Sequence, residues 1–496
     1  MLDLLALGAR EIFQPYPLLL LLLGTFGGII VGCLPGFTIT MGAALVLPLT
    51  FGMESIEGLA AMIGVLVGGL AGGQITGILL GIPGTPSSVA TVFDGHPMAS
   101  KGEPGRALAI GTWASFFGGL ISAVVLMFFT PPLADMAIKF GPWEFFSLVT
   151  FGLTVIASLS GDSVIKGIIS GLLGLVAASF GTDPITGVPR FTFGLYSLAG
   201  GFSFLPVLIG LFAFSQLMKN LEKSRNTTQS LVIDADLNFS SKSVLRELFR
   251  QPANLVRSSL VGVFVGALPG AGASIANILS YDLAKKVSTR PKAFGSGITD
   301  GIIASEAANN GTGGGGLTPT MALGVPGDAV SAIMMGALIL HGIQPGPLLI
   351  VEFPDLVYGV FVAFFVAHFF MLVMQLYGIK IFVQLTRIPL YLLIPSILVL
   401  CTVGSFAIHN RFFDIWALFI FGLLGYLLSK AGIPLAPMIL GVILGPMAES
   451  NFRRALMSDG NLWLFISRPI SAAFLVLALI SVCYPAIRPN RQKQKN

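Results

Sequence analysis

Four Pro-Gly pairs interrupt apolar stretches of this sequence, and polar side chains follow each of them. The pairs are Pro35-Gly36, Pro83-Gly84, Pro269-Gly270 and Pro326-Gly327. Proline removes a backbone donor and glycine tolerates irregular dihedral angles, so a helix that reaches such a pair is expected to break. A helix that restarts beyond the break points unpaired N–H groups and the positive end of its dipole into the gap. The pattern therefore predicts anion binding at broken helices.

The candidate substrate-binding residues are the four pairs and the small or polar residues behind them. No Lys or Arg lies within these segments, so the donors to a carboxylate are expected to be backbone N–H groups, hydroxyls and amides, with a co-bound cation as counter-charge. Each Ser or Thr taken singly also has a structural interpretation, because such hydroxyls often donate to a carbonyl of their own helix. The candidates are Pro35, Gly36, Thr38, Thr40, Pro83, Gly84, Thr85, Ser87, Ser88, Pro269, Gly270, Gly272, Ser274, Pro326, Gly327 and Ser331.

A second set of candidates would bind a coupling ion through oxygen atoms. The run from Glu306 to Thr312, which four glycines follow, is the most polar run among the apolar segments. An extramembrane loop is the alternative for this run, and Asp328 is equally suited to binding Na+, taking a proton or capping a helix. Na+ or H+ is the expected coupling ion, and no transition metal or other cofactor is predicted. The predicted ion ligands are Asn277, Asn309, Asn310, Thr312 and Asp328.

The composition is that of a membrane protein. The chain has 496 residues, of which 54% are hydrophobic and 10% are charged, against about 25% charged in soluble domains. Mean hydropathy is +0.87. Uncharged windows long enough to cross a bilayer recur along the chain, so we predict an all-α polytopic protein with about ten to thirteen membrane segments. The N-terminal apolar stretch is longer than a signal-peptide core and is expected to be retained.

The same numbers exclude several other classes of protein. Cys33, Cys401 and Cys483 are scattered without CxxC spacing, which argues against a disulfide framework or a cysteine metal site. The four histidines lack the spacing of a zinc site, and no GxxxxGK[ST] run supports ATP binding. The net charge of +5 comes from short loops and the tail, as expected for cytoplasmic ends of membrane helices rather than for nucleic-acid binding.

The two halves of the chain share motifs in the same order. Gly32–Gly36 matches Gly266–Gly270, and Gly81–Gly84 matches Gly324–Gly327. We therefore divide the chain into a first membrane repeat (1–218, the first half), a polar cytoplasmic linker (219–257), a second membrane repeat with C-terminal helices (258–487, the second half), and a basic cytoplasmic tail (488–496).

Charge indicates that the two repeats have opposite orientations. The loop after the first Pro-Gly pair carries Glu54 and Glu57, whereas its counterpart in the second half carries Lys285, Lys286 and further cations. Because Lys and Arg mark the cytoplasmic side, corresponding loops are predicted to face opposite sides. The expected architecture is an inverted-topology repeat with Pro-Gly-broken helices or re-entrant hairpins, which is common in secondary transporters.

These motifs, taken together, resemble the TctA family, the large membrane subunit of the tripartite tricarboxylate transporters. The similar segments in the first half are Gly32–Gly36, Met41–Ala44, Leu47–Phe51, Pro83-Gly84, Asp94–Met98 and Gly105–Leu108. Those in the second half are Leu268–Gly272, Glu306–Asn310, Leu323–Gly327 and His341–Pro347. The resemblance covers nearly the whole chain.

The resemblance implies a permease, not an enzyme, in the bacterial inner membrane. It implies import of tricarboxylates such as citrate, or of related organic carboxylates, by cation symport. The implied partners are a small membrane subunit (TctB-like), a periplasmic solute-binding protein (TctC-like) and the lipid bilayer, with no nucleic acid. Polar residues in Gly72–Thr76 and Gly84–Ser88 differ from those of many relatives. The identity of the transported carboxylate therefore stays open.

Two alternatives stay open at this point. A stand-alone secondary transporter for another small solute would share the broken helices. An intramembrane aspartyl protease would need two carboxylates that share a water, and Asp282 and Asp328 would have to supply them.

Overall fold

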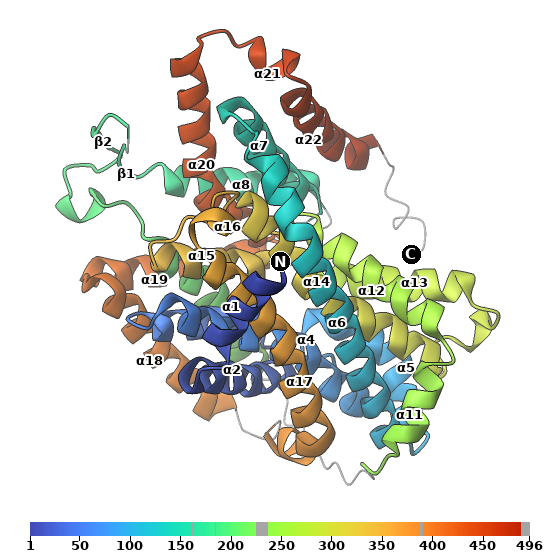
Figure 1. The fold of residues 1–496 in the computed structure, drawn as a ribbon. Helices are drawn as coiled ribbons and strands as arrows, with labels where there is room; N and C mark the ends of the chain where they lie inside the picture. The colour runs from blue at the N-terminus through green and yellow to red at the C-terminus, as the bar shows by residue number, and fades with distance from the viewer. Residues whose placement is uncertain (160–162, 184, 225–236, 386–389, 488–496) are drawn as a thin grey trace.

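The computed structural model describes residues 1–159, 163–183, 185–224, 237–385 and 390–487 (Figure 1). This part of the chain is almost entirely helical, which confirms the predicted all-α class. Its strands are β1 (Gly181–Thr182) and β2 (Pro189–Arg190), which pair antiparallel. The tail and the centre of the predicted linker, residues 225–236, lie outside the described residues.

The helices of the first half lead up to the predicted linker. They are α1 (Leu2–Ile12), α2 (Pro15–Cys33), α3 (Ile39–Val46), η1 (Leu47–Thr50), α4 (Ser55–Leu80), η2 (Pro86–Ser88), α5 (Val89–Ser100), α6 (Pro104–Ala137), α7 (Pro142–Leu159), α8 (Val164–Ala178), η3 (Tyr196–Leu198), α9 (Phe204–Leu208), the π-helical η4 (Ile209–Phe214) and α10 (Ser215–Ser224).

The second half repeats part of this order. Its helices are α11 (Ser241–Leu248), α12 (Pro252–Ala267), α13 (Gly272–Val287), η5 (Pro291–Ala293), α14 (Thr299–Leu323), α15 (Ala329–Leu340), α16 (Leu349–Glu352), α17 (Pro354–Leu385), α18 (Leu390–His409), α19 (Phe412–Lys430), α20 (Ala436–Ser458), α21 (Leu464–Ser467) and α22 (Pro469–Ile487). The predicted domain boundaries at 218 and 258 fall inside α10 and α12.

Six helical stretches among the described residues are long and apolar enough to cross a membrane. They are Pro15–Cys33, Ser55–Leu80, Pro104–Ala137, Phe204–Glu222, Pro354–Gln384 and Phe412–Lys430. Five shorter apolar helices of 10–17 residues accompany them. The protein is therefore a multi-pass membrane protein, and the total of about ten to thirteen segments stays a prediction.

The helices break at the Pro-Gly pairs, as predicted. After α2, Leu34 is extended and Gly36 has a φ of 87°; after α12, Leu268 is extended and Gly270 has a φ of 81°. Positive φ values of this size favour glycine, which explains the residue after each proline. The chain then turns back into α3 or α13, so each half begins with a helical hairpin whose tip is a Pro-Gly pair.

Each hairpin packs against the long helix that follows it through glycine. A Cβ atom added at Gly28 of α2 would lie 2.5 Å from the carbonyl oxygen of Val65 in α4. A Cβ atom at Gly262 of α12 would lie 2.2 Å from the carbonyl oxygen of Ala308 in α14. The backbones of α2 and α4, and of α12 and α14, are therefore in direct contact, as small residues allow in membrane helices.

One helix of each half packs against the hairpin and the long helix of the other half. α5 packs against α13 and α14, while its counterpart α15 packs against α3 and α4. The equivalent helices α4 and α14 also meet. The Asn309 amide donates to the Leu70 carbonyl at 2.8 Å, and Gly313, one turn further along α14, also faces Leu70. Gln74, one turn further along α4, lies instead beside Glu306, so the two helices run antiparallel.

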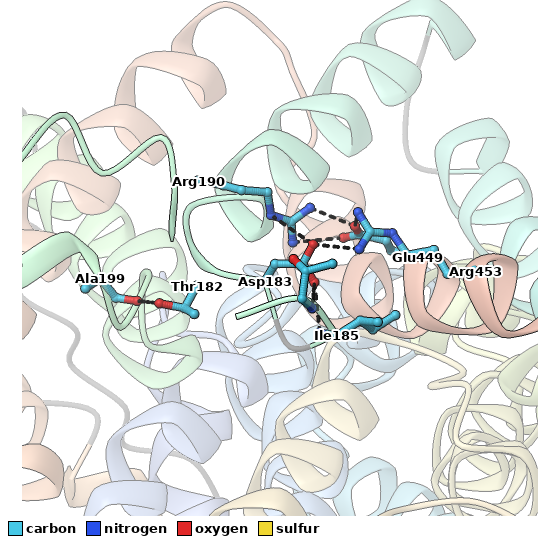
Figure 2. A network of polar contacts seen from close by, with 8 residues as sticks. Thr182, Asp183, Ile185, Arg190, Ala199, Glu449 and Arg453 are labelled. Atoms are coloured by element: carbon cyan, nitrogen blue, oxygen red, sulfur yellow. Dashed lines mark hydrogen bonds and ion pairs between the residues drawn. The ribbon is translucent and has the colours of Figure 1, made fainter. Parts of the chain in front are cut away.

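The loop that carries β1 and β2 extends from the helical body and is attached to α20 by ion pairs (Figures 1 and 2). Arg453 lies 2.6 Å from the Asp183 carboxylate, and Arg190 lies 2.7 Å from the Glu449 carboxylate. The backbone N–H of Ile185 also donates to Asp183 at 2.9 Å. This backbone hydrogen bond, and then the Arg453 guanidinium, lower the pKa of the Asp183 carboxyl.

We expect the attachment of this loop to α20 to weaken at acid pH. A carboxyl with a lowered pKa stabilises the folded form above its ordinary pKa of 3.8, and that stabilisation is lost as the pH falls through the lowered value. Asp183→Asn should release the loop at neutral pH, measured as faster hydrogen exchange over residues 185–199. Asp135→Asn, at an exposed residue of α6, is the control. Equal protection in Asp183→Asn and the parent protein would contradict the assignment.

Candidate functional site

The two breaks of the first half lie together. The N–H of Gly84 donates to the carbonyl of Gly73 at 3.2 Å. A Cβ atom added at Gly84 would lie 2.2 Å from the Gly32 carbonyl oxygen and 3.0 Å from the Gly73 Cα. The segment behind Pro83 therefore fits against the end of the α2 hairpin only because glycine occupies all three positions.

The second half builds the same contact from the matching residues. A Cβ atom at Gly327 would lie 2.2 Å from the Gly266 carbonyl oxygen and 2.8 Å from the Gly316 Cα. The N–H of Gly270 donates to the Gly327 carbonyl at 2.7 Å. In each half, the segment behind the second Pro-Gly pair therefore packs on the hairpin that ends at the first pair.

The first hairpin tip is held by α10. Gln216 and Asn220 both donate to the Gly36 carbonyl, at 2.7 Å and 3.1 Å. Thr38 caps α3 by accepting from the Met41 N–H at 3.1 Å. The irregular backbone around Pro35 is therefore stabilised by amide side chains of a separate helix.

A cavity of about 380 Å³ lies beside this tip. Its polar lining consists of Thr38, Thr40, Ser215, Gln216, Lys219 and Ser429, and Phe212 with residues 432–436, which lead from α19 into α20, completes it. The Ser215 hydroxyl donates to the Leu211 carbonyl, so its hydrogen is already used. The Thr38, Thr40 and Ser429 hydroxyls and the Lys219 ammonium can donate to an oxyanion, whereas the Gln216 amide already donates to the Gly36 carbonyl and to the Asn220 side-chain oxygen. The starts of α3 and α20 add positive dipole ends.

Sequence reasoning missed Lys219, Gln216 and Ser429. The candidates were chosen because they directly follow Pro-Gly pairs, and Lys219 was assigned to the linker as its first residue. The available signal was its place at the end of the apolar stretch 204–218, where a lysine can reach back along a helix. The expectation that the donors come only from neutral groups is incomplete for this cavity.

The other candidates of the first half are buried and paired with each other. The Thr85 and Ser87 hydroxyls lie 2.9 Å apart, and the Ser88 hydroxyl donates to the Thr85 carbonyl at 2.9 Å. These three residues form the start of α5 through η2. Their hydrogen bonds fit the local, structural interpretation that the sequence left open.

In the second half, Asp328 caps α15. Its carboxylate accepts from the Ser331 N–H at 2.8 Å, and its own N–H donates to the Ser331 hydroxyl at 2.8 Å. A Cβ atom at Gly272 would lie 3.5 Å from the Asp328 Cβ, so the first turn of α13, which contains Ser274, adjoins this cap. Capping, one of the roles considered for Asp328, is present.

The aspartyl protease is excluded by the position of Asp282. Gly272 adjoins Asp328, and Asp282 lies ten residues further along α13, about 15 Å away at 1.5 Å per residue. Asp282 is also exposed. Two carboxylates so far apart cannot activate one shared water.

Two of the predicted ion ligands, Asn277 and Asn309, hydrogen-bond to residues of the first half. The Asn277 side-chain oxygen accepts from the Ala90 N–H at 2.7 Å, and its amide donates to the Ser305 carbonyl at 3.2 Å. Asn277 therefore joins the second hairpin to α5 and α14. The Thr312 hydroxyl donates to the Asn309 carbonyl within α14 at 2.6 Å.

The polar run from Glu306 to Gly316 is helical and fully buried inside α14, which excludes an extramembrane loop. Its four glycines allow neighbouring helices to approach: a Cβ atom at Gly314 would lie 2.4 Å from the Ser122 carbonyl oxygen of α6. A Cβ atom at Gly315 would lie 2.3 Å from the Val263 carbonyl oxygen of α12. Glu306, Asn309 and Asn310 are thus placed at the centre of the molecule.

Comparison with known proteins gives one family and two relatives. Residues 18–440 match the family described as "Tripartite tricarboxylate transporter TctA family". An "Uncharacterized 52.8 kDa protein in TAR-I ttuC' 3'region" of Agrobacterium vitis is 35% identical over 496 residues, covering 99% of this chain and 97% of the relative. An "Uncharacterized protein in TAR-II ttuC' 3'region" of the same organism is 36% identical over 236 residues, covering 47% of this chain and 98% of the relative. No solved structure matches.

Proposed function

The chain belongs to the tripartite tricarboxylate transporter TctA family, and we propose that it is the large permease subunit of a transporter that imports tricarboxylates or related organic carboxylates. Family membership makes it a tricarboxylate transporter subunit in the membrane. The cavity beside Pro35-Gly36 supports the proposal for this particular chain, because the ammonium and hydroxyls in its lining can replace the water that a bound carboxylate loses.

The cavity also suggests the side on which the substrate is released. It is lined by the first half of α10, the helix that leads into the polar segment predicted to be cytoplasmic. In the proposed cycle the carboxylate leaves the solute-binding protein outside, crosses at the broken helices, and passes the Lys219 cavity on its way into the cytoplasm. A carboxylate held there exchanges water for charge-assisted hydrogen bonds.

The proposal includes partners and a location. A small TctB-like membrane subunit and a periplasmic TctC-like solute-binding protein assemble with the chain in the bacterial inner membrane. Import is driven by symport of Na+ or H+, in agreement with the lack of an ATP-binding motif in the sequence.

Opposite orientation of the two halves is also proposed. It is supported by the charge reversal between corresponding loops and by the antiparallel course of α4 and α14. Alternating access then consists of movement of one part of the molecule against the other.

Cysteine labelling tests this orientation. In a cysteine-free background, Glu54→Cys and Lys286→Cys should react with a membrane-impermeant maleimide from opposite sides of sealed vesicles, because their loops are equivalent in two inverted repeats. Labelling of both from the same side would contradict the inversion.

Uptake into proteoliposomes tests the function. The chain and its small membrane subunit are reconstituted, and a panel of labelled organic carboxylates is offered with and without the solute-binding protein and an imposed Na+ or H+ gradient. The expected result is uptake that needs both the binding protein and one of the gradients. Uptake without the binding protein would favour the stand-alone transporter, and no uptake of any carboxylate would overturn the substrate class.

A further inference from the structure

A buried carboxylate lies where the two halves of the molecule meet. Glu306 of α14 is fully buried. Its Oε1 accepts from the Thr91 hydroxyl of α5 at 2.5 Å, and its Oε2 accepts from the Ser115 hydroxyl of α6 at 2.9 Å and from the Asn309 amide at 3.4 Å. Both oxygens of this side chain therefore accept hydrogen bonds from hydroxyl or amide groups of other residues.

This carboxylate has no cationic side chain as a partner within the described residues. None of the ion pairs of the described chain includes Glu306. His368 on α17, the other buried titratable group near α6, donates through Nδ1 to the Phe364 carbonyl at 2.7 Å. Its Nε2 faces Gly119, one turn beyond Ser115 along α6. A buried charge without a counter-charge is strongly unfavourable, so Glu306 must either take a proton or be neutralised by a cation bound beside it.

Side-chain oxygens without a donor also lie on α4 and α14, the two helices that meet near Glu306. The side-chain oxygens of Asn309, Asn310 and Gln74 are buried and have no hydrogen-bond partner among the described residues. The Gln74 oxygen and Glu306 both approach Gly111 of α6: a Cβ atom added there would be 1.8 Å from that oxygen and 3.6 Å from the Glu306 Cγ. A proton would give these oxygens one donor, whereas a metal cation would satisfy several of them at once.

We propose that Glu306 is the acidic ligand of a Na+ site at the contact between the two halves, a role that rests on the proposed cation symport. The carboxylate, the side-chain oxygens of Asn309 and Gln74, and the hydroxyl oxygens of Thr91 and Ser115 supply the hard oxygen ligands that an alkali cation prefers. One carboxylate neutralises one positive charge, which favours a monovalent ion over a divalent one in a buried position.

The location gives the ion a function in coupling. Thr91, Ser115 and Gln74 come from helices of the first half, while Glu306 and Asn309 come from α14 of the second half. Na+ bound among them would hold the two halves together, and its release would leave a buried, uncompensated carboxylate between them.

Of the ion ligands expected from the sequence, Asn277 and Thr312 already use their polar atoms in hydrogen bonds within the protein.

Thermal unfolding of the purified full chain tests the site without any substrate. Melting is followed in NaCl, in KCl and in choline chloride at equal ionic strength. The expected result is a Tm that rises with Na+ specifically, because Na+ binds the folded form. Glu306→Gln, a neutral side chain of nearly the same shape, should lose the Na+-specific rise. Glu352→Gln, at an exposed residue of α16, should keep it.

A second variant keeps the test decisive if Glu306→Gln does not fold. Asn309→Ala removes one neutral ligand and should raise the half-saturating Na+ concentration about tenfold, as expected for loss of one contact to a charge. An unchanged Na+ dependence in folded Glu306→Gln or in Asn309→Ala would overturn the site. A Tm that depends on pH but not on Na+, and loses that dependence in Glu306→Gln, would overturn Na+ in favour of a proton.

These outcomes are separate from those of the transport assay. Loss of the Na+ effect in Glu306→Gln would support the site even if no carboxylate were taken up, in which case the transport proposal alone would fail. Carboxylate uptake with an intact Na+ effect in Glu306→Gln would support the transporter and overturn the site.

Discussion

Lys219→Met should weaken carboxylate transport more than any other single change in the cavity. The substitution keeps the length of the side chain and removes the one cation among the polar lining residues. Loss of a hydrogen bond to a charged group costs about 1.5–3 kcal/mol, which corresponds to about a 10- to 100-fold rise in the substrate concentration that gives half-maximal uptake. The measurement is initial uptake into proteoliposomes over a range of substrate concentrations.

Lys292→Met is the matched control. Lys292 is an exposed residue of η5 and lies far in sequence from the residues that line the cavity. Its substitution by methionine removes the same charge as Lys219→Met. Its uptake curve should equal that of the parent protein. If Lys219→Met and Lys292→Met gave the same curve, the ammonium would have no part in binding the carboxylate.

Gly327→Val should destabilise the folded protein strongly. The new Cβ would lie 2.2 Å from the Gly266 carbonyl oxygen and 2.8 Å from the Gly316 Cα, both of which are backbone atoms that cannot move independently of their helices. Overpacking of this kind commonly costs about 1–3 kcal/mol, and contact with backbone on two sides places this case at the upper end. We expect little monodisperse protein after purification and a lower Tm for the folded remainder.

Gly27→Val is the control for this prediction. Gly27 lies in α2, and a Cβ atom there meets no atom within 4 Å. The control therefore adds the same volume to a helix without a clash and should fold like the parent protein. Equal yield and Tm for Gly327→Val would show that the close approach at the second break is not required.

The breaks could be predicted from sequence because their cause is local. A proline followed directly by glycine in an apolar stretch disfavours a continuous helix locally, so Pro35-Gly36 and Pro269-Gly270 were identified from residue type and order. The match between the halves was also visible, and the structure adds its reason: Gly32 and Gly266 receive the backbone of the later break in the same way.

Contacts between distant segments could not be predicted in the same way. Thr91 and Ser115 reach Glu306 across 215 and 191 residues of sequence. Lys219 faces Thr38 and Thr40 only because α10 packs on the first hairpin tip. The glycine run 313–316 is unfavourable for an isolated helix, yet close contact with α6 and α12 stabilises it as one.

The claim at the centre of this account is that a carboxylate binds in the cavity beside Pro35-Gly36. Site protection tests it most directly. Cys33, Cys401 and Cys483 are replaced by alanine, and Thr40→Cys is then reacted with a maleimide in the presence and absence of the transported carboxylate. Thr186→Cys, on the exposed loop between β1 and β2, serves as the control. We predict slower labelling at position 40 alone when the carboxylate is present; equal rates with and without it would contradict the claim.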